Sequence, residues 1–321
     1  MDVPAPLVRG AASLRCPNCS APLRVHERSL VCEHRHTYDV SRHGHVTLAR
    51  SPASGDDATM VSARASVFDA GHYAPLTAAL ARTAAETVGG QGHGGGEVRG
   101  GGRKLRGGGE ARGSSEAHGG DEARGGEGVA GAGSDRVVLD IGAGTGHHLA
   151  GVLDALPGAL GFALDTSRPA LRLAARAHPD IAAVVGDVWE ALPLQDGVVD
   201  LALVVFAPRN GAEIVRVLKP GAAALVVIPT PEHLAALAHL HAVQVDPEKP
   251  ERLERTLGAH LEHEATTPLR WTMELSASDV EHVIRMSPAG AHRREVEPRA
   301  ATVTGSVELR IYRSPDVSGG G

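Results

Sequence analysis

Cysteine and aromatic residues are scarce in this chain of 321 residues, which holds three cysteines, three phenylalanines, three tyrosines and two tryptophans. So few cysteines, in an odd number, exclude an extensive disulfide framework, and we expect a cytoplasmic protein. The low aromatic content disfavours a protein that binds single-stranded nucleic acid mainly by stacking bases on aromatic rings.

Long apolar runs are missing as well. No segment approaches the roughly 20 consecutive apolar residues that cross a membrane, and no signal peptide is apparent at the beginning of the chain. We therefore expect no membrane partner. The length of the chain allows about two domains.

Glycine is abundant instead, and residues 89–134 hold 20 of the 40 glycines. This segment balances six basic against six acidic residues and contains few apolar ones. It cannot bury enough apolar surface to offset the entropy of ordering it. We interpret it as a flexible insertion that acts as a solvated spacer, in preference to a segment whose arginines touch RNA.

The segment VVLDIGAGTG, residues 137–146, is an apolar run that reaches Asp140 and continues into Gly142, Gly144 and Gly146. A buried strand that ends in a glycine turn lets a nucleotide-like ligand approach the backbone closely. The spacing D-x-G-x-G-x-G differs from the dinucleotide fingerprint G-x-G-x-x-G. It resembles motif I of S-adenosylmethionine-dependent methyltransferases of the Rossmann-like class.

Four more apolar runs follow at the spacing of an α/β fold, and the first two end in Asp165 and Asp187. An acid at the end of the second strand can accept hydrogen bonds from ribose hydroxyls, and Asp187 can contact an adenine edge. A single carboxylate of this kind is more often a solvated loop residue than a ligand contact, but three acids at three successive strand ends favour a binding site. The pattern predicts a doubly wound parallel sheet, with runs within 159–165, 181–187, 192–208 and 219–229 and helices over 147–156 and 168–177.

The later part of the chain predicts the end of this sheet. Residues 251–264 suit an amphipathic helix, and 277–286 suit another. LRWTMEL and SVELRIYRS, on either side of the second helix, predict the antiparallel hairpin with which a methyltransferase sheet commonly finishes.

All three cysteines lie near the beginning of the chain, in CPNC and CEHRH. Cys16, Cys19, Cys32 and His36 form a Cys3His set with the ligand spacing of a structural zinc site. His34 is a competing fourth ligand, and a redox-active cysteine pair is the alternative. A closed set of four ligands leaves no open position for catalysis.

The first 50 residues are also basic, with seven arginines against four acidic residues. A small basic zinc module suggests an anionic substrate that the module grips. Phosphate contacts are plausible for Arg24, Arg28, Arg35 and Arg42, although a solvated basic face explains any single arginine as well.

Three segments carry a more specific resemblance: CPNC…CEHRHTYDVSRHGHVTL, GDDATMVSARASVFDAGHYAPL and DIGAGTG. Their order resembles that of the 23S rRNA (guanine-N1)-methyltransferases, in the Gram-positive branch of the tylosin- and mycinamicin-resistance type. The resemblance covers residues 14–88 and 135–313. We therefore divide the chain into a zinc-binding RNA-recognition module (1–50), a helical connector (51–88), the insertion (89–134), a methyltransferase domain (135–313) and a disordered tail (314–321).

The resemblance implies transfer of a methyl group from S-adenosylmethionine to N1 of a guanine in 23S rRNA. The target would be of the position 748 type, in hairpin 35. Macrolide resistance and a possible homodimer are implied with it. By position, Tyr73, Gly146, His147 and His233 would contact the methyl donor, and Cys16, Cys19, Cys32 and His36 would bind zinc.

Candidate catalytic residues follow the fourth apolar run. Arg209 is expected to stabilise charge on guanine O6 and Asn210 to hydrogen-bond the base edge, although both could simply cap the loop. Two rival functions stay open, a small-molecule methyltransferase of antibiotic biosynthesis and a non-catalytic zinc-dependent RNA-binding protein.

Overall fold

The computed structural model describes residues 2–51, 55–89, 136–240, 256–287 and 297–316. The predicted glycine-rich insertion lies outside the described residues except for Gly89, and the predicted terminal tail lies outside them except for residues 314–316. None of the helices in these ranges combines the length and apolar character that crossing a lipid bilayer requires.

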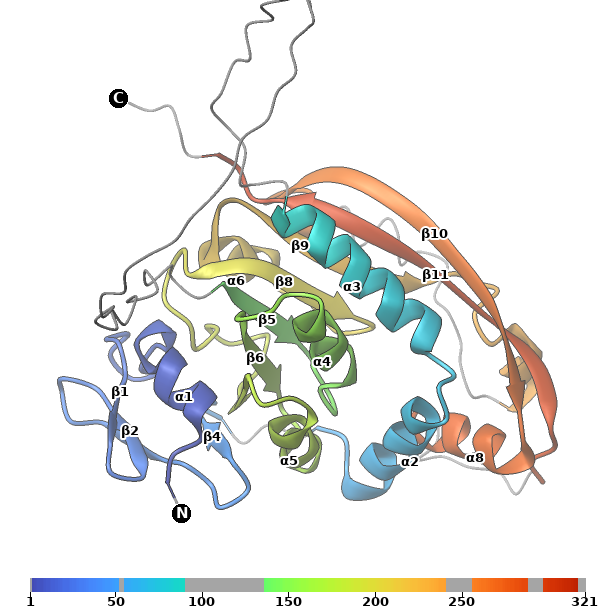
Figure 1. Ribbon diagram of the computed structural model, residues 1–321, viewed down its shortest axis with the longest axis horizontal. Coiled ribbons are helices and arrows are strands. Elements are labelled where there is room, and N and C mark those ends of the chain that lie inside the picture. Colours follow the sequence, from blue (N-terminus) through green and yellow to red (C-terminus); the bar gives the residue numbers. More distant parts are fainter. Residues whose placement is uncertain (1, 52–54, 90–135, 241–255, 288–296, 317–321) are drawn as a thin grey trace, which may run out of the picture.

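An eight-stranded sheet runs through the molecule in the order β10-β11-β9-β8-β5-β6-β7-β4 (Figure 1). The six strands from β9 to β4 are parallel, and β11 and β10 are antiparallel. This arrangement confirms the predicted Rossmann-like class. The strands are β4 (His45–Thr47), β5 (Val137–Ile141), β6 (Leu160–Asp165), β7 (Ile181–Val185), β8 (Val199–Val205), β9 (Leu218–Pro229), β10 (Glu262–Leu275) and β11 (Ala301–Arg313).

Helices flank this sheet, and several begin at a side-chain cap. Asp57 accepts hydrogen bonds from the amides of Thr59 and Met60, and Ser276 forms a capping box with Asp279. Such caps satisfy amides that have no partner inside the helix. The helices are α2 (Ala58–Asp69), α3 (Ala74–Gly89), α4 (His147–Asp154), α5 (Arg168–Ala177), α6 (Gly211–Val217), η3 (Ala235–Leu240) and α8 (Ala277–Arg285).

The expected helix over 251–264 is wrong at its carboxyl end. Residues 251–255 lie outside the described residues, but β10 begins at Glu262, whose partner in β11 is Arg313. The ladder to β11 extends along the whole of β10. Long-range pairing with β11 therefore overrides the local helical pattern in this segment.

The amino-terminal segment is built into the same core as the sheet. It contains α1 (Ala5–Gly10), η1 (Ala11–Ser13) and the small sheet β1 (Arg24–His26), β2 (Ser29–Val31) and β3 (Thr37–Asp39), before β4 joins the large sheet beside β7. Leu7, Leu14 and Leu30 are fully buried and belong to one apolar cluster with Phe162 and Val184 of the large sheet. The opposite face of the sheet packs against α3, α4 and α8 through a second cluster.

Gly10 lets α1 approach this core closely, because a Cβ there would lie 2.5 Å from the ring of Phe162. We expect Gly10→Ala to overpack the contact and lower the free energy of unfolding by about 1–3 kcal/mol. The matched control is Val8→Ala on the same helix, where half of the side chain is exposed and the loss should stay below about 0.5 kcal/mol. Denaturant titrations of both variants test this, and equal stabilities would contradict the close packing.

Candidate functional site

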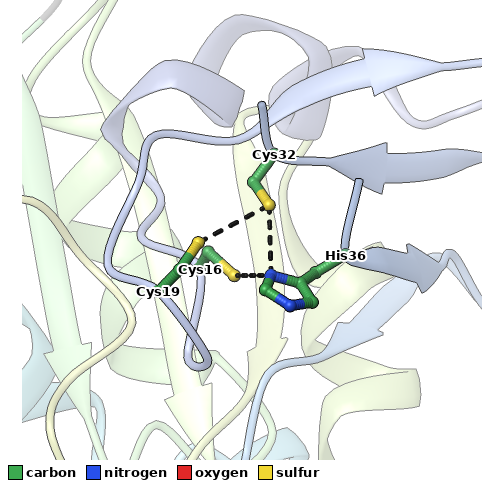
Figure 2. A group of neighbouring side chains, drawn as sticks. All are labelled: Cys16, Cys19, Cys32 and His36. Carbon is green, nitrogen blue, oxygen red and sulfur yellow. Dashed lines mark hydrogen bonds between the residues drawn. The ribbon is translucent and has the colours of Figure 1, made fainter. Parts of the chain in front are cut away.

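Cys16, Cys19, Cys32 and His36 come together in the amino-terminal module, with all four ligand atoms within 4.8 Å of one another (Figure 2). The Sγ atoms of Cys19 and Cys32 are 3.6 Å apart, and His36 Nδ1 lies 3.5 Å from Cys16 Sγ and 3.4 Å from Cys32 Sγ. Tetrahedral zinc bonded to sulfur and imidazole nitrogen would place its ligand atoms roughly 3.5–3.8 Å apart. Three thiols and one imidazole in this geometry therefore fit a structural zinc ion.

Two left-handed residues close the turns that present the sulfur atoms. Ser20 has a φ of +66° and donates its amide to the Cys16 carbonyl at 2.8 Å. Arg35 has a φ of +65° and donates its amide to the Cys32 carbonyl at 3.0 Å. The Tyr38 hydroxyl lies 3.1 Å from Cys16 Sγ and supports this ligand from outside the cluster.

The competing ligand His34 stays outside the cluster. Its side chain is 60% exposed and lies 4.0 Å from a carboxylate oxygen of Glu33. The sequence preference for the longer spacing to His36 therefore agrees with the geometry of the described residues.

The second group of predicted residues lies at the carboxyl ends of the parallel strands. Gly142, Gly144 and Gly146 form the turn between β5 and α4, and all three have positive φ angles, from +54° to +78°. A Cβ at Gly142 would lie 2.5 Å from that of Ala207, so only glycine fits there without a shift of the neighbouring loop. Gly146 is the residue before α4, so the helix amides face this turn.

The carboxylate of Asp165 ties the glycine turn to the end of β6. Its Oδ2 accepts a hydrogen bond from the Gly144 amide at 2.8 Å, and its Oδ1 accepts one from the Ser167 amide at 2.7 Å. Burial raises the pKa of Asp165, and the two amides oppose that shift. Each carboxylate oxygen can accept a further hydrogen bond, so Asp165 can still accept the expected hydrogen bonds from ribose hydroxyls.

Two more predicted carboxylates differ in their surroundings. Asp140, only 2% exposed, has a pKa raised to about 8 by burial and by the nearby charge of Asp165. Asp187 lies just after β7, where its Oδ1 accepts a hydrogen bond from the Trp189 amide at 2.9 Å. The three acids thus lie at or near the carboxyl ends of three neighbouring strands, with Asp140 one residue before the end of β5, Asp165 at the end of β6 and Asp187 two residues after β7.

Tyr73 and His233 are far apart in sequence but share a hydrogen bond, with the Tyr73 hydroxyl 3.2 Å from His233 Nε2. Both side chains are buried. His233 Nδ1 accepts the amide of Ser306 at 3.1 Å, so the neutral ring carries its proton on Nε2 and donates it to Tyr73. The hydroxyl proton of Tyr73 is therefore available for another acceptor.

An aromatic cluster surrounds this pair, and the sequence reasoning missed it. The rings of Phe68, Phe206 and Trp271 have centroids 5.6, 6.3 and 5.8 Å from that of Tyr73. His147 stacks on Phe68 with a centroid distance of 4.5 Å. Phe68 comes from α2, His147 from α4, Phe206 from the loop after β8 and Trp271 from β10. No local sequence pattern joins such distant segments.

Phe206 is the exposed member of the cluster. It follows β8 directly, has a φ of +55° and leaves 38% of its surface exposed. A left-handed phenylalanine is uncommon and strained, which is a feature typical of functional sites. The available sequence signal was its place at the end of an apolar run, next to Arg209 and Asn210.

The two predicted catalytic residues lie in the loop between β8 and α6, and both are half-buried. Asn210 directly precedes α6 but its side chain makes no capping hydrogen bond. The side-chain amide of Asn210 therefore does not cap α6.

Comparisons with known proteins match both parts of the chain. Residues 138–221 match the family described as Methyltransferase domain, and residues 14–49 match the zinc-ribbon family described as RlmA, N-terminal. The chain is 41% identical over 303 residues to a 23S rRNA (guanine(748)-N(1))-methyltransferase of Streptomyces fradiae, and the match covers 93% of each chain. It is also 41% identical over 315 residues to a protein of Micromonospora griseorubida named as a 23S rRNA (guanine-N(1)-)-methyltransferase, covering 94% of this chain and 97% of that one.

Replacing one ligand should release the zinc ion. Cys19 is the least buried of the three cysteines, so Cys19→Ser removes a ligand with little direct loss of packing. We expect the purified variant to lose its bound zinc and to unfold at a lower temperature, because metal binding stabilises the folded state. Elemental analysis measures the metal. The matched control His34→Ala should keep one zinc per chain. Loss of zinc from this control would mean that His34, and not His36, is the fourth ligand.

Proposed function

Because the chain belongs to the family of 23S rRNA (guanine-N1)-methyltransferases, we propose that it methylates N1 of a guanine in 23S rRNA. The observation that carries this proposal is 41% identity along 93% of the chain to the Streptomyces fradiae enzyme, whose name specifies guanine 748. By the same likeness we propose a target of the position 748 type in hairpin 35. Methylation there would give resistance to macrolides such as tylosin or mycinamicin.

We place the methyl donor at the carboxyl ends of β5, β6 and β7. S-adenosylmethionine supplies a methyl group that is already activated on a sulfonium centre, so the chain contributes mainly by positioning the reactants. Gly142 and Gly144 would pass close to the donor, Asp165 would accept its ribose hydroxyls, and Asp187 would contact its adenine edge.

Tyr73 has a defined part in this assignment. Burial raises its pKa, so the hydroxyl stays neutral, and His233 holds it in one orientation. Its free proton can then be donated to the donor's carboxylate. His147 and Gly146, at the beginning of α4, would complete the contacts to the same group.

The acceptor base would enter beside Phe206. Guanine N1 lies on the Watson–Crick edge, so the base must be unpaired or flipped out before it can react. The exposed ring of Phe206 would stack on the base, as aromatic side chains commonly do with extruded bases. Asn210 would hydrogen-bond the base edge, and Arg209 would stabilise negative charge on O6 as N1 loses its proton.

Two other functions fit less well. A small-molecule methyltransferase has no need of the basic metal-binding module that is packed into the sheet. A non-catalytic RNA-binding protein has no need of the glycine turn, nor of Asp165 placed to fasten it to β6. We therefore propose 23S rRNA as the substrate, the cytoplasm as the location and, from the likeness to the family, a homodimer as the solution state.

Primer extension on 23S rRNA tests the reaction directly. RNA treated with the purified protein and S-adenosylmethionine should stop reverse transcriptase next to the modified guanine, because a methyl group at N1 blocks base pairing. Label incorporated into small molecules but not into RNA would favour the small-molecule alternative.

Asn210→Ala should lower the single-turnover rate about 10²-fold without weakening donor binding. An unchanged rate would remove Asn210 from the site.

Donor binding should release a proton through Asp140. With a pKa of about 8, this carboxyl group is mostly protonated at pH 7 in the free protein. A bound sulfonium and ammonium would favour the ionised form, so affinity should rise by up to about tenfold per pH unit below pH 8 and level off above it. Calorimetry at pH 7 in two buffers with different ionisation heats measures the released proton.

Asp140→Asn is the matched variant for this measurement. It should bind the donor more weakly and with the same heat in both buffers, since no carboxyl proton is left to release. Buffer-independent heats for the unmodified protein would contradict the assignment of Asp140.

A further inference from the structure

Three arginines form a row on the solvent-facing side of α5. Arg168, Arg172 and Arg176 are four residues apart, so they share one face of the helix at intervals of about 6 Å along its axis. All three are exposed, and none forms an ion pair with a carboxylate in the described part of the chain. Like charges at this spacing destabilise a helix, so the row has a cost that an anionic partner would offset.

The turn between β3 and β4 in the metal-binding module packs directly against this helix. A Cβ added at Gly44 would lie 3.3 Å from the Cβ of Ala175 in α5. Burial, followed by the charges of Arg172, Arg42 and Arg176, lowers the pKa of His43 in this turn. The guanidinium groups of Arg42, in the metal-binding module, and of Arg172 and Arg176, in α5, therefore lie close to His43.

A shallow cavity of about 270 Å³ opens where the two parts meet. Arg28 and Arg42 of the metal-binding module and Arg176 of α5 line it together with His43. Asp2 is the one carboxylate among its lining residues in the described part of the chain. The cavity is therefore dominated by positive charge and is open to a ligand from solvent.

Eight arginines elsewhere in the described structure pair with a carboxylate, and several of these also donate to backbone carbonyl oxygens. The paired arginines are Arg9, Arg15, Arg64, Arg216, Arg270, Arg285, Arg310 and Arg313. Six other described arginines also form no ion pair, namely Arg24, Arg35, Arg50, Arg82, Arg136 and Arg299. The charges around α5 differ from these in lying side by side, in a chain whose net charge is −6.

We infer that Arg28, Arg42, Arg168, Arg172 and Arg176 form a basic strip that binds consecutive phosphate groups of the substrate rRNA. The inference rests on the proposed function and extends it to a surface outside the reaction centre. Guanidinium groups bind phosphate oxygens through paired hydrogen bonds, and free guanidinium groups meet this need better than paired ones.

The direction of the strip connects it to the reaction. Arg168 directly follows Ser167, whose amide binds the carboxylate of Asp165 at the cofactor edge. Arg176, eight residues further, reaches the cavity at the metal-binding module. An RNA backbone along the strip would therefore extend from the reaction centre to the zinc-stabilised module and hold the target hairpin in register.

The test compares two triple variants of the full-length protein that remove the same charge. The strip variant carries Arg168→Gln, Arg172→Gln and Arg176→Gln. The control variant carries Arg82→Gln, Arg136→Gln and Arg299→Gln, at exposed arginines that form no ion pair in the described structure and lie outside the strip. The probe is a 23S rRNA fragment that contains nucleotide 748, and affinity is measured at several salt concentrations.

For the strip variant we expect at least about tenfold weaker RNA binding and a salt dependence whose slope is shallower by about 2, since each lost phosphate contact removes roughly 0.7–0.9 from it. KM for RNA should rise while kcat at saturating RNA and the affinity for S-adenosylmethionine stay unchanged. The control variant should bind RNA with nearly the slope of the unmodified protein.

The outcomes separate this inference from the proposed function. If the strip and control variants bind RNA alike, the strip is not the phosphate-binding surface. If binding depends on the strip but no guanine is methylated, the proposed reaction fails and the inference stands. If the unmodified protein binds no RNA, both are overturned.

Discussion

The pairing of β4 with β7 is the contact on which the rest of the structure depends. Residues His45–Thr47 run parallel to β7, and the amide of Leu48 extends the ladder to the Val185 carbonyl at 2.9 Å. In addition, Leu7 and Leu14 of the metal-binding module share an apolar cluster with strands of the large sheet. Burial of apolar surface is the main favourable contribution to folding, so the module is an integral part of this core.

The same attachment links the metal centre to the loop after β7, beside the proposed position of the methyl donor. Glu190, which lies in the loop just after Asp187, accepts hydrogen bonds from the amides of Arg50 and Ser51 at 2.9 and 3.1 Å. Arg50 Nε in turn donates to the carbonyl of Pro17, within the first cysteine turn, at 2.6 Å. A closed zinc site cannot take part in the chemistry. Under the proposed function, its contribution would be to hold Arg28 and Arg42 beside α5, at a fixed distance from the methyl donor.

Residues that act through local spacing could be predicted from the sequence. The Cys3His set and the turn from Gly142 to Gly146 depend on a few neighbouring positions, and the apolar runs predicted the parallel strands because buried strands need such runs. Features that depend on distant contacts could not. β4 is too short to stand out, β10 replaces the expected helix after residue 261 through its pairing with β11, and the cluster around Tyr73 joins separate segments. Composition shows that aromatic residues are few but does not show that several of them gather around Tyr73.

Hydrogen exchange with and without zinc tests the shared core most directly. After a chelator removes the metal, amides of β7 should lose protection together with those of β2 and β3, while β8 and β9 keep theirs, because β7 loses its neighbour β4 when the module opens. Unchanged protection of β7 alongside an opened metal-binding module would contradict the account, since the two parts would then be independent domains.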